Sequence, residues 1–341
     1  MEKIRVGVIG CGRISVVYME AWQRLSEEIE VVFAVDKVAD RAKAFASHFI
    51  GCGYSDSVED LICVKPDVAH VLTPHFLHKQ QTIQCLNAGI HVLTEKPMAL
   101  TLEDADEMIR ASVINRKRLG VISQNRYIEG IQEAKRLIEA GALGRIKGAF
   151  SNLNWWRPPS YYQCDWKGSW DKEGGGVVID QAIHSLDLVR FLMGCEVRSV
   201  KAHIDKRVLT EIEVEDVADA VITFENDAVY SFYACNYYTE NSPIQVEISG
   251  EKGTVHLNKE EVTISLEGQP DYIVHSAGDL SGEGEGYWGS YHYIQLKEFY
   301  QCIRTGENVH VDPKDSRKTL ELVLDIYRSS KESRMIDHSN V

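Results

Sequence analysis

The sequence predicts an α/β domain followed by an α+β domain. Over residues 1–123, short apolar strands alternate with amphipathic helices, which is typical of βαβ units whose parallel sheet is covered on both faces. After residue 144 the pattern changes to longer strands in which apolar and polar residues alternate. A chain of 341 residues is long enough to form a core in each part. We therefore expect one domain over residues 1–123 and a second over residues 124–341.

The elements of the first domain follow from apolar runs and from apolar stripes at helical spacing. Strands are expected at residues 5–9, 31–35, 68–72, 91–94 and 119–122. Helices are expected at residues 14–25, 38–48, 75–88 and 102–115. In a sheet of this kind, ligands bind at the edge formed by the carboxyl ends of the strands.

The second domain begins with a helix over residues 126–140, which has an apolar face and stops at Gly141. Strands are expected at residues 146–156, 197–205, 217–224, 229–238 and 244–249, with a turn over residues 249–254. Two closing helices have apolar stripes, formed by Leu296, Phe299, Tyr300 and Ile303 and by Leu320, Val323, Leu324 and Tyr327. The order predicts helices on one face of a large, mostly antiparallel open sheet.

The predicted strand at residues 229–238 has bulky side chains on both faces. A sheet covered by helices on one side alone exposes its other face. We expect that face to pack against another subunit, and an uncovered tyrosine-rich face is the alternative.

The composition is that of an ordinary globular protein, with 44% hydrophobic and 26% charged residues. A net charge of -14 argues against nucleic acid or an anionic membrane as a partner. The sequence shows no secretory signal and no apolar run long enough to span a bilayer, so we expect a cytoplasmic protein. The eight cysteines include no CxxC pair, and we expect them to be reduced thiols.

A glycine turn follows the first strand and precedes the first helix. In the Gly-x-Gly-x-x-Gly pattern, the first glycine makes the tight turn and the second lets the backbone approach a pyrophosphate. Gly10 and Gly12 fill these positions, and Ser15 takes the third, where a small side chain still allows close helix packing. The turn also contains Cys11, Arg13 and Ile14. The context predicts a Rossmann dinucleotide-binding domain with the pyrophosphate at the helix N-terminus.

Asp36 ends the second strand, where its carboxylate can accept hydrogen bonds from both ribose hydroxyls. Its charge repels a 2′-phosphate and so favours NAD over NADP. The neighbouring ammonium of Lys37 can partly neutralise such a phosphate, so NADP stays possible.

Two later segments supply the groups that take a proton from an alcohol while its hydride leaves. The first is Glu95-Lys96-Pro97, and the second runs from three glycines at 174–176 to Asp180 and His184. We expect His184 to act as general base in oxidation and general acid in reduction, with Asp180 binding substrate hydroxyls. Lys96 can stabilise alkoxide character at the reacting oxygen, or can itself accept the proton. A metal site at Asp180, His184 and Asp187 lacks a companion cluster, and no metal is predicted.

Residues 73–78 and 87–97 resemble the Gfo/Idh/MocA oxidoreductases, and the resemblance extends over nearly the whole chain. Further landmarks lie at residues 124–127, 143–144, 174–184 and 299–306. The resemblance implies a Rossmann domain followed by an open-sheet domain for substrate binding and oligomerisation. It also implies a nicotinamide-dependent dehydrogenase for a secondary hydroxyl of a sugar, sugar derivative or cyclitol, working as a homodimer or homotetramer.

The same resemblance assigns roles to individual residues. Lys96 is expected to reach both the substrate hydroxyl and the nicotinamide. Further residues are expected to contact the cofactor or to lie at the edge of the active site, and these are Thr73, Pro74, His78, Glu95, Asn125 and Arg126. His75 stands where the family often has asparagine, so no role is assigned to it.

Four of the six tryptophans fall between residues 155 and 170. An aromatic wall with polar tips suits a sugar ring, and we expect Trp156, Arg157 and Tyr161 to bind substrate. Arg157 can clamp a phosphate or a carboxylate with two hydrogen bonds. Trp155 is expected in the core or in an oligomer interface, and Tyr237, Tyr287 and His292 are weaker candidates for the pocket rim.

Two other functions stay open from the sequence. One is a non-catalytic regulator of the same fold that senses a dinucleotide or sugar. The other is an enzyme with tightly bound NAD that is recycled internally.

Overall fold

The structure is a computed structural model that describes residues 2–259, 261–275 and 290–339. The chain divides into two compact units. Of the described residues, the first unit contains 2–124 and 290–317, and the second contains 125–259, 261–275 and 318–339. No helix in these ranges combines the length and apolar character that crossing a membrane requires. All eight cysteines are free thiols, as the sequence predicted.

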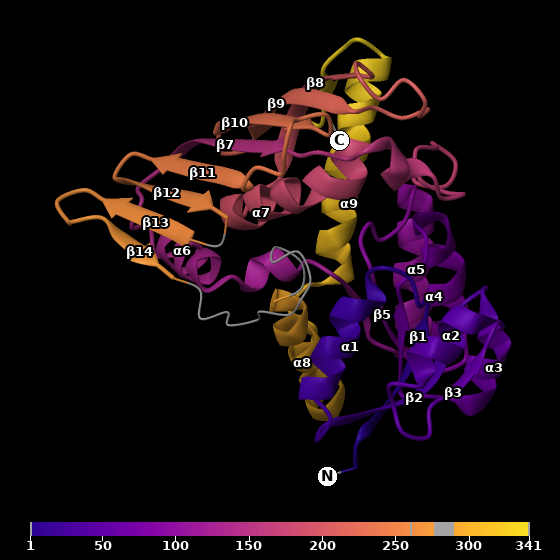
Figure 1. Cartoon of the computed structure of the whole chain (residues 1–341). Coiled ribbons are helices and arrows are strands. Elements are labelled where there is room, and N and C mark those ends of the chain that lie inside the picture. The colour runs from indigo at the N-terminus through magenta and orange to yellow at the C-terminus, as the bar shows by residue number, and fades with distance from the viewer. Residues whose placement is uncertain (1, 260, 276–289, 340–341) are drawn as a thin grey trace. The chain divides into compact units, whose positions relative to one another are not determined.

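The first unit is built on a six-stranded parallel sheet with the order β3-β2-β1-β4-β5-β6 (Figure 1). Its strands are β1 Ile4–Ile9, β2 Ile29–Val35, β3 Gly53–Ser55, β4 Val68–Val71, β5 His91–Thr94 and β6 Leu119–Val121. The order reverses direction at β1, which is the arrangement of a Rossmann sheet. The predicted α/β class is therefore confirmed.

The helices of this unit confirm the predicted alternation of strand and helix. They are α1 Ser15–Arg24, α2 Ala39–Ala46, α3 Val58–Val64, α4 His78–Asn87, α5 Leu102–Asn115 and α8 Ser290–Thr305. The sequence did not predict β3 and α3. A strand of three residues and a helix of seven are too short to show a clear period, although Ser57 caps α3 by accepting a hydrogen bond from the backbone of Glu59.

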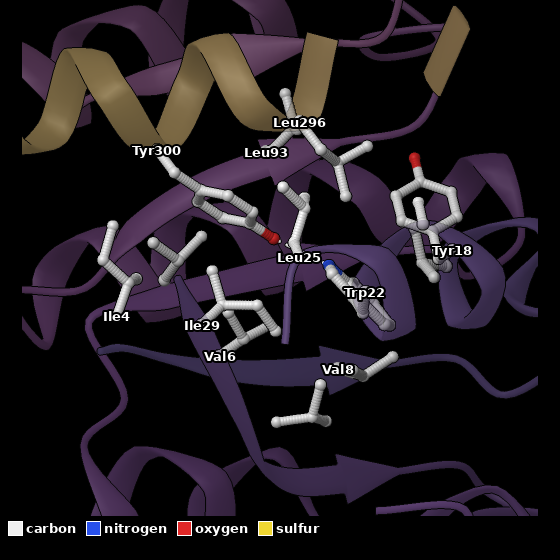
Figure 2. Packing of buried hydrophobic residues seen from close by; sticks show 14 of the residues in the cluster. Ile4, Val6, Val8, Tyr18, Trp22, Leu25, Ile29, Leu93, Leu296 and Tyr300 are labelled. Carbon is white, nitrogen blue, oxygen red and sulfur yellow. Dashed lines mark hydrogen bonds between the residues drawn. The ribbon is translucent and has the colours of Figure 1, made fainter. Parts of the chain in front are cut away.

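Helix α8 groups with the first unit, which corrects the placement of residues 290–317 in a second domain spanning 124–341. Leu296, Phe299 and Tyr300 join the core cluster that contains Tyr18 and Trp22 of α1 (Figure 2). The indole Nε1 of Trp22 donates a hydrogen bond of 2.7 Å to the hydroxyl of Tyr300. The apolar stripe of α8 was predicted from the sequence, but a stripe does not reveal which unit it packs against.

The second unit contains a nine-stranded sheet with the order β14-β13-β12-β11-β7-β10-β9-β8-β15. Its strands are β7 Ile146–Asn154, β8 Val197–Asp205, β9 Val217–Phe224, β10 Val229–Cys235, β11 Gln245–Gly250, β12 Gly253–Asn258, β13 Glu261–Leu266, β14 Tyr272–Val274 and β15 Ile336–Asp337. Strands β7 and β10 run parallel, and the other pairs are antiparallel. The predicted turn joins β11 to β12, where Ser249 faces Thr254.

Helices cover one face of this sheet. They are α6 Glu129–Glu139, α7 Ile183–Met193 and the second-unit part of α9 Pro313–Lys331. Helix α7 packs on β7 and β11, and α6 packs on β12, β13 and β14 (Figure 1). Along β10, Tyr230 and Phe232 are buried, whereas Val229 on the opposite face is 43% exposed. This arrangement confirms the predicted open sheet with helices on one side.

The hydroxyl of Tyr300 provides a test of the contact between α8 and α1. It accepts from Trp22 and lies 2.8 Å from Nε2 of His70, so Tyr300→Phe leaves two buried ring nitrogens without their partner. We expect the free energy of unfolding to fall by roughly 1–3 kcal/mol for each such group. The free energy of unfolding in urea should be measured for Tyr300→Phe and for Tyr293→Phe, a control on the same helix. The hydroxyl of Tyr293 has no hydrogen bond among the described residues. Equal losses in the two variants would refute this explanation.

Candidate functional site

The glycine turn after β1 has the geometry that a dinucleotide site requires. Gly10 has a φ of +100°, and a Cβ built there would lie 2.8 Å from the backbone of Leu72. A Cβ at Gly12 would meet no atom within 4 Å, so the backbone there borders open space. The buried hydroxyl of Ser15 donates 2.7 Å to the carbonyl of Gly12 and fixes the start of α1. Serine in the third position therefore stabilises the turn.

Asp36 at the end of β2 is tied to the same turn. Its Oδ2 accepts a hydrogen bond of 2.9 Å from the backbone N–H of Cys11, and its Oδ1 accepts one of 2.9 Å from Val38. Burial, together with the charge of Asp36, raises the pKa of the Cys11 thiol to about 12, so the thiol stays protonated at neutral pH. Lys37 is exposed beside it.

These residues fit a bound dinucleotide. The open space over Gly12 and the N-terminus of α1 suit a pyrophosphate, because helix N-termini present unpaired N–H groups and a positive dipole end. The carboxylate of Asp36, held against the turn, is the ribose acceptor that the sequence predicts.

The Glu95-Lys96-Pro97 loop follows β5. Residues 92–99 are buried except for Lys96, which is half-buried. The buried Oε1 of Glu95 accepts a hydrogen bond of 2.7 Å from Tyr18 and lies 3.4 Å from Nε2 of His292. Burial acts to raise the pKa of Glu95, but His292, Lys96 and Tyr18 together lower it to about 2. Glu95 is therefore a fixed negative charge that anchors the loop, and His292 lies in the core of the first unit.

His78 connects this loop to the one that follows β4. It is fully buried, with Nδ1 2.8 Å from the carbonyl of Pro97 and Nε2 2.8 Å from the carbonyl of Thr73. The Thr73 hydroxyl donates to Gln81 at 2.5 Å. Burial lowers the pKa of His78. In the structure, His78 holds these two loops together.

In the second unit, residues 174–176 are glycines, and at Gly175 and Gly176 neighbouring atoms leave no room for a side chain. Gly175 has a φ of +149°, and a Cβ there would lie 2.0 Å from the hydroxyl of Tyr327. A Cβ on Gly176 would lie 1.9 Å from the carbonyl oxygen of Glu215. The Glu215 carboxylate accepts hydrogen bonds from the N–H groups of Gly176 (2.8 Å) and Val178 (3.0 Å) and from Tyr327 (3.0 Å). No side chain larger than glycine fits this approach.

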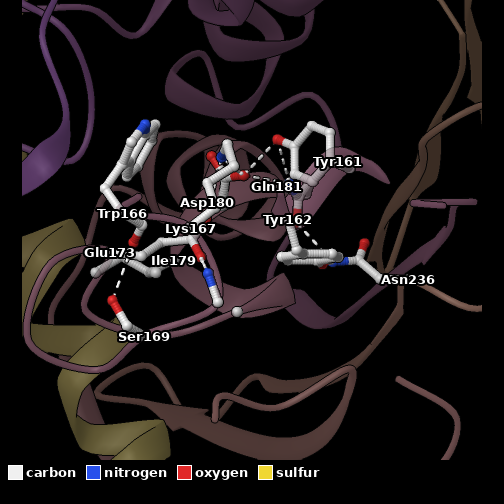
Figure 3. Close-up of polar contacts among 12 residues, drawn as sticks. Tyr161, Tyr162, Trp166, Lys167, Ser169, Glu173, Ile179, Asp180, Gln181 and Asn236 are labelled. Carbon is white, nitrogen blue, oxygen red and sulfur yellow. Dashed lines mark hydrogen bonds and ion pairs between the residues drawn. The ribbon is translucent and has the colours of Figure 1, made fainter. Parts of the chain in front are cut away.

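The π-helical turn Val178–Ala182 follows and contains Asp180. The Oδ2 of Asp180 accepts hydrogen bonds from Lys167 Nζ (2.6 Å), Tyr161 Oη (2.7 Å) and the side-chain amide of Gln181 (Figure 3). The residue is 8% exposed. Because three donors of the chain occupy this oxygen, the structure gives Asp180 an organising role in addition to the substrate contact that the sequence predicts.

A second set of polar residues holds these donors in place. Lys167 also pairs with Glu173 at 3.0 Å, and its ammonium lies over the rings of Tyr161 and Trp166, 4.5 and 4.3 Å from their centroids. Burial raises the pKa of Glu173 to about 7. Nothing in the local sequence distinguished Lys167 or Glu173, which lie in a loop without a recognisable motif.

Gln181 is fixed from its other end by a strand. Asn236, which directly follows β10, donates 2.9 Å to Oε1 of Gln181 and 3.1 Å to the hydroxyl of Tyr162. Asn236 is fully buried and was not predicted, since a single asparagine after a strand has no distinctive pattern.

His184 lies in the first turn of α7. All residues from 175 to 190 are buried except His184, which is half-buried. The predicted candidate Arg126 is engaged elsewhere, because it donates from Nε and Nη2 to Asp187 at 2.7 and 2.5 Å. Burial acts to raise the pKa of Asp187, but Arg126, Thr319 and Arg190 lower it. This pairing engages Asp187, and the described residues contain no group of three metal-binding side chains.

The aromatic segment divides as the alternation of a strand predicts. Trp155 is 6% exposed and belongs to the core, whereas Trp156 is 39% exposed and forms a bridge with Tyr237. The guanidinium of Arg157 lies over the rings of Trp155 and Tyr161, 4.6 and 5.2 Å from their centroids. Tyr287 lies outside the described residues.

The predicted site residues thus form a set in each unit. Those of the first unit follow the carboxyl ends of β1, β2, β4 and β5, and they are Gly10, Cys11, Gly12, Arg13, Ile14, Asp36, Lys37, Thr73, Pro74, His78, Glu95 and Lys96. Those of the second unit are Asn125, Arg126, Trp156, Arg157, Tyr161, Asp180 and His184. Within the second set, Tyr161 joins Arg157 to Asp180, and Arg126 lies apart in its pair with Asp187.

Comparison with known proteins gives matches over both units. Residues 4–123 match the model of the oxidoreductase family with an NAD-binding Rossmann fold, and residues 131–256 match the GFO/IDH/MocA C-terminal domain. The WlbA dehydrogenase from Bordetella pertussis, solved in complex with NADH and UDP-GlcNAcA, is 30% identical with a TM-score of 0.87, over 98% of this chain and 99% of that one.

Two curated relatives match over nearly their whole length. A scyllo-inositol 2-dehydrogenase (NAD(+)) from Bacillus subtilis is 26% identical, over 94% of this chain and 92% of its own. A D-apiose dehydrogenase from Paraburkholderia graminis is 26% identical, over 99% of this chain and 90% of its own.

Gly12→Ala tests the dinucleotide turn without disturbing the fold. The added methyl group meets no atom of the chain, so the midpoint of thermal unfolding should stay unchanged. It projects into the open space over the turn, and NAD affinity measured by calorimetry should fall roughly tenfold or more, about 1.4 kcal/mol. Gly10→Ala is the matched variant and should lose stability, because its Cβ contacts the backbone of Leu72. Normal NAD affinity in Gly12→Ala would place the pyrophosphate elsewhere.

Glu215 gives the stability a predictable pH dependence. Burial raises its pKa from 4.5 to about 7, so between these pH values the folded state keeps a proton that the unfolded state has lost. The contribution of Glu215 to the free energy of unfolding therefore falls as the pH rises through this window. Relative to Glu215→Gln, the wild-type protein should lose stability from about pH 5 to about pH 7 and change little above that.

Urea denaturation at several pH values measures this difference. The control is Glu211→Gln, because Glu211 is exposed nearby. A difference between wild type and Glu215→Gln that does not vary with pH would contradict the prediction.

Proposed function

The chain belongs to the Gfo/Idh/MocA family of oxidoreductases, and on that premise we propose that it is an NAD-dependent dehydrogenase for a secondary hydroxyl of a sugar, sugar derivative or cyclitol. The observation that supports this best is the dinucleotide cradle at Gly10, Gly12 and Asp36. The class of substrate is supported by relatives named for inositol and apiose and by a similar structure solved with UDP-GlcNAcA.

When bound, NAD supplies the nicotinamide that accepts a hydride from the carbinol carbon. We assign the proton of the hydroxyl to an imidazole nitrogen of His184 during oxidation, and the same nitrogen returns it during reduction. Imidazole suits this role because its ordinary pKa lies near neutrality. As an ammonium, Lys96 donates a hydrogen bond to the reacting oxygen and stabilises its developing negative charge. As a neutral amine, Lys96 is the alternative proton acceptor.

The surroundings of the two groups support these roles. Lys96 and His184 are the half-buried positions in segments, residues 92–99 and 175–190, that are otherwise buried. Each of these side chains is accessible to a substrate, while the buried residues on either side hold its backbone in place. A group positioned in this way can contact the substrate in a defined geometry. Asp180 keeps this part of the second unit ordered through Lys167 and Tyr161.

We also propose a cytoplasmic homodimer or homotetramer that packs through the open sheet face. Phe150, Val221 and Val229 on that face are 42%, 51% and 43% exposed, and Phe150 and Val221 flank Ser231 in register across three neighbouring strands. Apolar side chains gathered on an uncovered sheet face are typical of a subunit interface. The free thiols are compatible with a reducing compartment.

Reduction of NAD and NADP, measured with inositols, aldoses, uronates and nucleotide sugars, tests the proposed activity. His184→Asn and Lys96→Met should each lower kcat by roughly 100-fold or more, while NAD affinity stays within a few-fold of wild type. His203→Asn is the control, because His203 is exposed on β8 and belongs to neither segment. Full activity in both site variants would refute the assigned roles, and no activity with any substrate despite NAD binding would favour a sensor.

A further inference from the structure

Arg157 is a buried cation whose hydrogen bonds are incomplete. It is 4% exposed, and its Nη1 donates to the carbonyl of Trp156 at 2.9 Å and to Oδ1 of Asn241 at 3.1 Å. Its Nε and Nη2 are also buried, and neither has a hydrogen-bond partner among the described residues. A buried N–H without a partner is destabilising, and more so when the group is charged.

The charge of Arg157 is also not balanced by the residues that contact it. Two other enclosed cations of this unit have carboxylate partners, since Arg126 pairs with Asp187 and Lys167 pairs with Asp180 and Glu173. The contacts of Arg157 are two neutral oxygens and the faces of Trp155 and Tyr161. A guanidinium stays protonated in a protein, so the group that completes this environment is an anion.

The geometry of the two unused donors narrows the kind of anion. Nε and Nη2 lie on one edge of the planar guanidinium, the edge that binds both oxygens of a carboxylate through parallel hydrogen bonds. Contact with the rings of Trp155 and Tyr161 restricts the movement of the guanidinium. A phosphate could use the same edge, so the position of the site has to decide between the two.

Tyr161 provides that position. Its ring covers one face of Arg157, and its hydroxyl donates to Asp180 at 2.7 Å. One tyrosine side chain therefore connects the anion site to the carboxylate of the Asp180 turn. A carboxylate on the sugar ring is bonded to the same ring as the hydroxyls that Asp180 is expected to bind, whereas the diphosphate of a nucleotide sugar lies outside the ring.

We propose that Arg157 binds the carboxylate of the substrate, which is a hexuronate, either free or linked to a nucleotide. This inference rests on the proposed function, because it names the substrate class of that same site. It makes Arg157 the residue that distinguishes a sugar acid from the neutral sugar of the same ring configuration.

Matched pairs of sugars test the proposal. NAD reduction is measured with UDP-glucuronate against UDP-glucose and with glucuronate against glucose. In the wild type, kcat/KM should favour the acid by roughly 100-fold in at least one pair, because a neutral sugar leaves the buried donors unsatisfied. In Arg157→Gln this preference should fall below about tenfold, and Arg157→Lys, which keeps the charge without the two-donor edge, should lie between. Arg145→Gln, at an exposed ion pair with Asp227, is the control and should keep the wild-type preference.

Three results would overturn the proposal. These are equal turnover of acid and neutral sugar, a preference that Arg157→Gln leaves unchanged, and UDP binding that depends on Arg157, since this last result would make a phosphate the ligand. If Arg157→Gln does not fold, Arg157→Lys carries the same comparison.

Calorimetry with UDP-glucuronate and glucuronate separates this proposal from the proposed function. If no sugar reduces NAD, binding of either acid that is lost in Arg157→Gln still supports the anion site and refutes only the dehydrogenase activity. Absence of binding by both acids would refute the anion site.

Discussion

The ion pair between Lys167 and Asp180 is the interaction on which the second unit's site depends. Oδ2 of Asp180 accepts from Lys167, Tyr161 and Gln181, so one oxygen joins the loop after β7 to the turn before α7. Charge-assisted hydrogen bonds in a water-poor environment are strong, and removing one partner leaves a buried charge behind. Because His184 lies one helical turn after Asp180, this network also sets the start of the helix that carries the imidazole.

Buried carboxylates fix the other loops of the site in the same way. Asp36 accepts a hydrogen bond from the glycine turn, Glu95 accepts one from Tyr18, and Glu215 accepts two from the backbone around the glycine triplet. Loops and helix starts have N–H groups without backbone partners, and a carboxylate satisfies several of them at once. Loops fixed by such bonds need few side chains for packing, which allows glycines where the backbone must approach a neighbour.

The sequence predicted regular elements well and their partners poorly. Strands 197–205 and 217–224 have the predicted bounds because long alternation is a strong signal, whereas three-residue β3 has none. Strands β12 to β14 were also missed, since they follow one another as short hairpins. Asp180 and His184 were identified from their spacing in the sequence. Lys167 and Glu215 were missed because each contacts residues far from it in the sequence. No local sequence pattern indicates such a contact.

Arg126 and Arg157 look alike in the sequence, and the structure distinguishes them by their hydrogen-bond partners. Both are buried in the second unit, and the sequence assigned both to the site. The desolvation cost of a guanidinium must be repaid by an anion or by hydrogen bonds. Asp187 supplies Arg126 with both an opposite charge and two hydrogen bonds, so this buried guanidinium needs no further partner. Arg157 receives aromatic faces and two neutral acceptors, and the edge formed by its Nε and Nη2 stays unused among the described residues. A chain that gives Arg126 an anion and leaves the hydrogen bonds of Arg157 incomplete has kept that edge for a group that it does not itself supply.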